Sequence, residues 1–149
     1  MALSIHSQEV LNHRLSEIEK LRSLGLLDND LKVKYTRPII DAHGKLFQVS
    51  PPPKKSMKMK IGSCYSNAHS KREKEYEYVE GIIKNKNTGL EISHAWNVDK
   101  NGNHFDFTIM ETDLFEYKGV IVPFSLRYQV SVQTGKVWYC VLPYLTFDV

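Results

Sequence analysis

Residues 75–108 read EYEYVEGIIKNKNTGLEISHAWNVDKNGNHFDFT, and this stretch decides the fold. Two segments rich in aromatic and β-branched residues, 75–84 and 91–98, have the composition of β-strands. A turn at 85–89 separates them, and an Asn-Gly pair, which favours tight hairpins, leads into a third predicted strand at 104–108. The stretch therefore predicts an antiparallel meander.

A helix is predicted just before this meander. Gly62 and Ser63 precede Cys64, and the helix is expected to run from Cys64 to about Lys74. One helix followed directly by an antiparallel sheet predicts an α+β domain, with the Cys64 helix packed against the sheet.

Three residues of this region have the types that nucleophilic acyl transfer requires. Cys64 begins the predicted helix, where the macrodipole favours a thiolate and the first-turn N–H groups are free to donate to an oxyanion. His94 is the expected base, and Asp106, on the neighbouring predicted strand, is expected to hold its ring in one tautomer. The sequence predicts a catalytic triad of Cys64, His94 and Asp106.

The motifs around these residues resemble the core of the transglutaminase-like superfamily, which is related to papain-like hydrolases. The resemblance is closer to small Cys-His-Asp proteins of phages and bacteria, and it covers residues 61–124, which are predicted to be the catalytic core. The motifs that carry it are Gly62-Ser63-Cys64-Tyr65-Ser66-Asn67-Ala68, Tyr78-Val79-Glu80-Gly81, His94-Ala95-Trp96-Asn97, Asp106-Phe107-Thr108 and Tyr117-Lys118-Gly119-Val120.

Three side chains near the triad are predicted to contact the substrate, namely Tyr65, Asn67 and Trp96. The sequence also departs from the families that it resembles. The glutamine that papain-like enzymes place shortly before the cysteine is absent, which leaves Asn67 and Gln48 as candidates for the second oxyanion donor. Phe107 follows Asp106 where the family usually has proline.

The resemblance implies a cysteine-dependent acyl-transfer enzyme: a peptidase, amidase, deamidase or transamidase that acts on a protein or peptide-like amide without a cofactor. The resemblance to phage proteins implies a host protein as partner, in the host cytoplasm. The alternative is a non-catalytic binding protein on the same scaffold, such as a phage inhibitor of a host factor. Zinc binding by Cys64, His69, His94 and His104 lacks the usual paired ligand spacing and is not expected.

Residues 51–60, here called the lysine loop, contain three prolines and four lysines. The prolines prevent a regular element. The loop is either a solvated surface segment or a guide for an acidic substrate or RNA. Nucleic-acid binding through this loop, His94 and His104 is the less favoured reading, because the net charge of the chain is only +3.

The remaining segments yield weaker predictions. A helix capped by Ser7 and ended by Gly25 is expected within residues 1–27, and residues 31–49 are expected to be extended or irregular, with a turn at 41–44. Residues 119–123 are a possible strand. Residues 127–133 and 136–142 are a possible hairpin, although the first could equally be a short helix. Cys140 is expected in the core, and Glu80 is expected to orient the end of a helix or strand.

The 149 residues predict a single domain, and two cysteines are too few for a disulfide scaffold. The N-terminus lacks the features of a signal peptide, and no apolar run is long enough to cross a bilayer. We expect a soluble cytoplasmic protein with no membrane partner.

Overall fold

The computed structural model describes residues 3–60, 62–71, 76–136 and 139–147, and this part of the chain has an α+β fold. Its helices are α1 (Gln8–Ser23), α2 (Asp28–His43), α3 (Cys64–Ser70) and α4 (Phe124–Thr134). Its strands are β1 (Leu3–Ile5), β2 (Lys45–Phe47), β3 (Val49–Ser50), β4 (Glu77–Asn85), β5 (Glu91–Val98), β6 (His104–Phe105), β7 (Phe115–Val122) and β8 (Leu145–Phe147).

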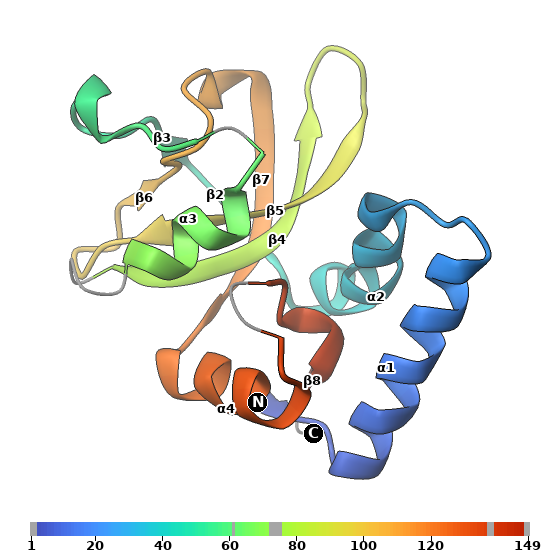
Figure 1. Cartoon of the computed structure of the whole chain (residues 1–149). Coiled ribbons are helices and arrows are strands. Elements are labelled where there is room, and N and C mark those ends of the chain that lie inside the picture. The colour runs from blue at the N-terminus through green and yellow to red at the C-terminus, as the bar shows by residue number, and fades with distance from the viewer. Residues whose placement is uncertain (1–2, 61, 72–75, 137–138, 148–149) are drawn as a thin grey trace.

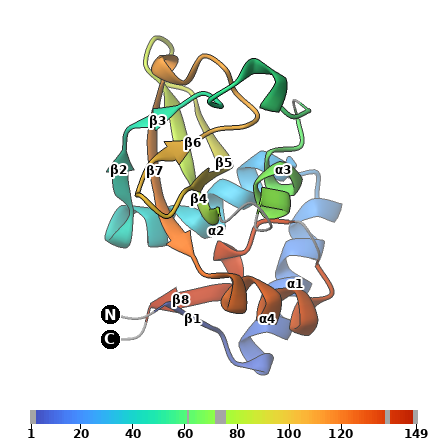
Figure 2. The same ribbon diagram turned by 90° about the vertical axis from the view of Figure 1, so that its left-hand side faces the viewer.

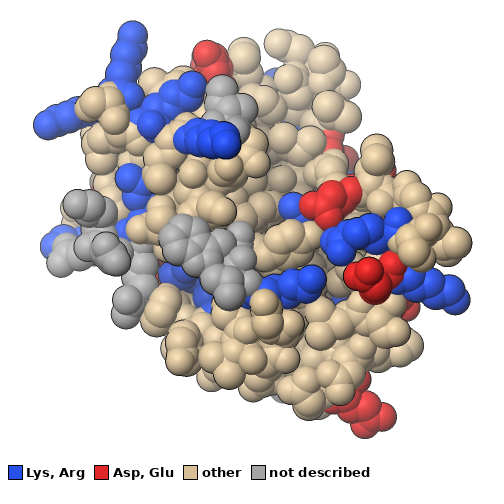
Figure 3. Space-filling model, viewed as in Figure 1, with Lys and Arg blue, Asp and Glu red and all other residues tan. Residues whose placement is uncertain are grey.

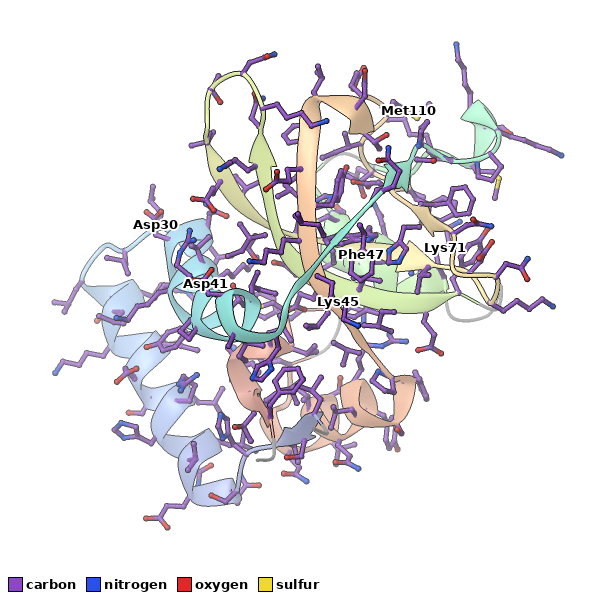
Figure 4. The ribbon with its side chains drawn as sticks, turned by 180° about the vertical axis from the view of Figure 1, so that it is seen from behind. Asp30, Asp41, Lys45, Phe47, Lys71 and Met110 are labelled. Atoms are coloured by element: carbon purple, nitrogen blue, oxygen red, sulfur yellow. The ribbon has the colours of Figure 1, made fainter. Side chains whose placement is uncertain are left out.

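Six strands form one sheet in the order β2-β7-β4-β5-β6-β3. The predicted strands pair antiparallel, β4 with β5 and β5 with β6, but the sheet as a whole is mixed because β3 pairs with β6 in parallel. Strands β2 and β3 lie at opposite edges although only Gln48 separates them in sequence, so the sheet must curl until its edges approach each other. The ring of Phe47 on edge strand β2 stacks at 4.0 Å on His104 of β6, the strand next to edge strand β3 (Figure 4).

The predicted meander is confirmed at its centre. Strand β4 pairs with β5 on one side and with β7 on the other, and Gly81 lies opposite both His94 and Gly119. A Cβ atom at Gly81 would lie 2.0 Å from the carbonyl oxygen of Lys118, so only glycine allows the β4 and β7 backbones to approach this closely.

Two clusters of buried side chains lie on the two faces of the sheet. The larger cluster joins the sheet to the four helices and to the C-terminal segment, and it includes Leu11, Ile40, Tyr78, Ala95 and Leu142. The smaller cluster lies inside the curl and includes Trp96 and Tyr117. Figure 1 shows α3 lying across β4 and β5, with α1, α2 and α4 grouped below and to the right.

The N-terminal helix is confirmed. The Ser7 side chain accepts a hydrogen bond from the Val10 N–H at 3.4 Å, and Gly25, with φ of +92°, follows the end of α1. Strands β1 and β8 then pair antiparallel, which brings both ends of the described chain side by side (Figure 2).

The prediction of an extended segment at 31–49 is wrong for most of its length, because α2 occupies Asp28–His43. Pro38 lies inside this helix, where it cannot donate a backbone hydrogen bond. Burial of one face compensates for this loss, since Leu31, Thr36 and Ile40 are all buried.

The prediction of a C-terminal hairpin is also wrong for the described part of the chain. Residues 127–133 belong to α4, which was the alternative, and residues 137 and 138 lie outside the described residues. The N–H groups of Val141 and Leu142 donate to the buried carboxylate of Glu80, both at 2.8 Å. These backbone donors therefore bind a side chain instead of a neighbouring strand, and Glu80 orients this segment as expected.

Among the described residues, no helix has the length and apolar character needed to cross a membrane.

Candidate active site

Cys64 is the first residue of α3 and is partly exposed. Gly62, with φ of +86°, reverses the chain just before the helix, and the Asn67 N–H donates to the Ser63 carbonyl oxygen at 2.8 Å. The helix is shorter than predicted, since it ends at Ser70, and residues 72–75 of the predicted helix lie outside the described residues. The predicted start of the helix at Cys64 is confirmed.

Asp106 is held more firmly than the sequence indicates. Strand β6 ends at Phe105, because the Asp106 carboxylate accepts hydrogen bonds from the Thr108 and Ile109 N–H groups at 2.9 and 3.0 Å and turns the chain. The prediction that 104–108 is all strand is therefore wrong, and Asp106 lies just beyond the strand end. The second carboxylate oxygen accepts from the Tyr117 hydroxyl at 2.7 Å.

His94 and Asp106 form a buried pair. The Nε2 atom of His94 lies 2.7 Å from the Oδ2 atom of Asp106, and both side chains are almost fully buried. Binding of Nε2 to the carboxylate leaves Nδ1 as the ring nitrogen that can exchange a proton with a nucleophile.

Cys64 contributes to the raised pKa of His94, so the thiol lies near the imidazole ring. Helix α3 packs on the β5 face that carries Ser93, Ala95 and Asn97, whereas His94 alternates with them and points to the opposite face. Strand β6 pairs only with residues 97 and 98 of β5. Cys64 itself packs against the larger cluster, on the α3 side of the sheet.

His94 and Asp106 each stabilise the charged form of the other. Burial lowers the pKa of His94, but the nearby charge and hydrogen bond of Asp106, together with Cys64, outweigh burial and raise this pKa to about 10. Burial raises the pKa of Asp106, yet His94 and Tyr117 outweigh it and hold that pKa below its usual value. At neutral pH the site therefore contains an imidazolium and a carboxylate.

Trp96 supports His94 from the core and does not reach the surface. Its exposed fraction is 1%, its ring packs directly against Gly119, and its Nε1–H donates to Nδ1 of His104 at 2.9 Å. The ring lies 6.4 Å from that of His94. Its assignment to substrate binding stays a prediction that this burial does not favour.

Tyr65 and Asn67 also serve the packing of α3. The Tyr65 hydroxyl hydrogen-bonds to Ser93 within the core. The Asn67 amide donates to the Lys60 carbonyl oxygen at 2.9 Å and to the Thr108 hydroxyl at 2.8 Å. Both donor hydrogens of Asn67 therefore have partners, which does not favour it as an oxyanion donor. Gln48 is exposed between β2 and β3.

The other titratable candidates have structural partners. Cys140 is 2% exposed and lies in the core as predicted, where burial raises the pKa of its thiol. The Nε2 atom of His69 lies 2.8 Å from the carbonyl oxygen of Tyr139, and its Nδ1 atom lies 2.9 Å from the Arg127 guanidinium. Burial lowers the pKa of His69 to about 4, so its ring is neutral. No group of three potential metal ligands occurs among the described residues.

Sequence reasoning missed the role of Tyr117. Its hydroxyl is the fourth donor to the Asp106 carboxylate, and it comes from β7, which does not neighbour β6 in the sheet. The only signal was the Tyr-Lys-Gly-Val segment at 117–120, in which the spacing indicates a strand but no partner.

Comparison with protein-family models, with curated proteins and with solved structures found no match to this chain.

Proposed function

We propose that the protein is a cysteine-dependent acyl-transfer enzyme in which Cys64 is the nucleophile, His94 the general acid and base, and Asp106 the residue that orients His94. The observation that carries this proposal is the buried His94–Asp106 pair, in which Nε2 of His94 lies 2.7 Å from the carboxylate, together with the partly exposed Cys64, which contributes to the raised pKa of His94.

The chemistry follows from these positions. A protonated His94 favours the thiolate form of an adjacent cysteine. The Cys64 sulfur attacks the carbonyl carbon of an amide, and the carbon–nitrogen bond breaks as His94 gives its proton to the leaving amine. The resulting thioester is then cleaved by water, whose proton returns to His94, or by a second amine. Water as acceptor makes a peptidase, amidase or deamidase, and an amine makes a transamidase.

The proposal is tested with p-nitrophenyl acetate, a small acyl donor that requires no specific binding site. The wild-type protein is expected to release p-nitrophenolate in a burst and to carry an acetyl group on Cys64, which peptide mass spectrometry identifies. The variants C64A and H94A are expected to lose the burst, because the nucleophile and the base act as one unit.

Cys140 provides a control within the same chain. Because it is buried, it should remain unacetylated in the folded protein, and C140S should retain the full burst. A non-catalytic binding protein predicts a different result: Cys64 would acetylate no faster than a free cysteine, and H94A would not change its rate. That result would exclude the enzyme.

A further inference from the structure

The lysine loop is fixed at both ends beside the triad. At its start, the Asp106 N–H donates to the carbonyl oxygen of Ser50 at 2.9 Å. At its end, the Met59 N–H donates to the carbonyl oxygen of Phe107 at 2.7 Å, and the Lys60 carbonyl accepts from Asn67 at 2.9 Å. Each anchor lies within three residues of Asp106 or Cys64 in sequence, so the loop projects from the wall of the candidate active site.

The loop has a defined shape between these anchors. A short 3₁₀ turn, η1 (Lys55–Met57), is closed by a hydrogen bond from the Met57 N–H to the Lys54 carbonyl at 2.9 Å, and Lys58 donates back to Lys55 at 3.1 Å. The lysines Lys54, Lys55, Lys58 and Lys60 are all exposed. Their charges are therefore presented to solvent from an ordered segment.

These four charges have no acidic partner in the part of the chain that the structure describes. Within the described ranges, no acidic side chain forms an ion pair with any of them, whereas Lys32 and Arg37 on α2 pair with Asp28 and Glu91 at 3.0 and 3.3 Å. Figure 3 shows Lys and Arg side chains gathered at the upper left, where Figure 1 has the lysine loop, whereas most acidic side chains lie on the opposite side. The Lys71 amine, just after α3, lies 4.1 Å from the centre of the Phe107 ring.

We infer that the lysine loop selects acidic polypeptide substrates, namely those with glutamate or aspartate residues next to the amide that Cys64 attacks. This inference rests on the proposed function. Exposed charges interact over about 10 Å at moderate ionic strength, so the loop acts on groups close to the scissile bond and not on the far end of a substrate. A polypeptide fits better than a nucleic acid, because an acyl-transfer site needs a carbonyl carbon beside the thiol.

The test compares two peptide chloromethyl ketones that alkylate cysteine, acetyl-Glu-Glu-Glu-Gly and acetyl-Gln-Gln-Gln-Gly, which differ only in charge. The second-order rate of Cys64 alkylation is measured for each. The wild-type protein is expected to react about 10-fold faster with the acidic peptide at low ionic strength, and the ratio should approach one at high salt.

The variant K54Q/K55Q/K58Q/K60Q should lower this ratio to about one while its rate with the neutral peptide stays unchanged. The matched control K20Q/K84Q/K86Q/K136Q removes the same number of charges elsewhere and should keep the wild-type ratio. Equal rates with both peptides in the wild-type protein would overturn the inference and leave the proposed function standing.

Two further outcomes are informative. If Cys64 reacts with neither peptide faster than in H94A, the proposed function fails and the inference fails with it. A short oligouridine that binds more tightly than the acidic peptide, and that loses its binding in the lysine-loop variant, would identify the loop as a nucleic-acid surface and would also overturn the inference.

Discussion

Asp106 and Glu80 are two equally buried carboxyl groups whose pKa values are shifted in opposite directions. Both are 0% exposed, and each accepts several hydrogen bonds. Asp106 binds the His94 ring in addition to uncharged donors. The hydrogen-bond donors to Glu80 are the Tyr78 hydroxyl and two backbone N–H groups, all of them uncharged.

The difference appears directly in their protonation. Burial raises the pKa of Glu80 to about 7 despite its three donors, whereas the imidazolium holds the pKa of Asp106 below its usual value. Burial alone therefore does not decide the charge of an acid in this protein; a neighbouring cation does. The Asp106 region leads to a partly exposed thiol, while the Glu80 region leads only to the C-terminal backbone.

The variant D106N tests the contrast between Asp106 and Glu80 most directly. The amide can turn its N–H₂ group toward His94 and favour the wrong tautomer, so we expect the rate of Cys64 acylation to fall by about 10³–10⁴-fold. The measurement is the p-nitrophenyl acetate burst. A rate within about threefold of wild type would remove Asp106 from the mechanism.

The variant E80Q should lower stability and leave acylation unchanged. Its N–H₂ group faces one of the donors from Tyr78, Val141 or Leu142, so the free energy of unfolding should fall by about 3 kcal/mol without loss of acylation in the folded protein. Urea unfolding measures this change. E77Q, on the exposed side of the same strand, is the control and should change stability by less than about 0.5 kcal/mol. If E80Q abolished acylation in folded protein, the two regions would not be independent.

The two pKa shifts predict two separate pH windows. Glu80 keeps its proton to a higher pH in the folded state than in the unfolded state, so stability should fall as pH rises from 4.5 to about 7. His94 behaves likewise between 6.5 and about 10, because the stability from its raised pKa is complete below 6.5 and lost above 10. Since one pKa unit corresponds to about 1.4 kcal/mol, the falls should be on the order of 3 kcal/mol for Glu80 and 5 kcal/mol for His94.

Urea unfolding at a series of pH values separates these windows. The fall below pH 7 should disappear in E80Q, and the fall above pH 7 should remain in that variant. A profile in wild type that is flat through either window would contradict the corresponding pKa shift.

The smallest expected effect is that of Y117F. It removes one of several donors to Asp106, and the others remain, so the loss of stability should be about 1 kcal/mol and the acylation rate should fall by less than tenfold. Y128F, whose side chain is exposed on α4, is the matched control. A loss as large as that of D106N would mean that Tyr117, not the backbone donors, fixes the carboxylate.

Local patterns predicted the part of the fold in which neighbours in sequence are neighbours in space. The alternation in 75–84 and 91–98 predicted β4 and β5. The hydrogen bond between His94 and Asp106 also follows from the expected hairpin, although its strand is shorter than predicted.

The remainder depends on contacts between distant segments. Pro38 indicates a helix end by every local rule, and only burial of the opposite face against the core keeps α2 continuous. Similarly, the composition of residues 136–142 is that of a strand, but Glu80, about 60 residues earlier, binds two backbone donors within it. No local pattern indicates such a partner.

The pairing of β1 with β8 has a mechanical consequence. Leu3 lies opposite Phe147 and Ile5 lies opposite Leu145, so residues 3 and 147 lie together at one end of the two-stranded ladder. A tensile load applied between residues 3 and 147 would therefore open this ladder one rung at a time, like a zipper, and would not shear all its bonds together. Beyond the last rung, the load would reach the backbone near Leu142, which Glu80 clamps to the large sheet.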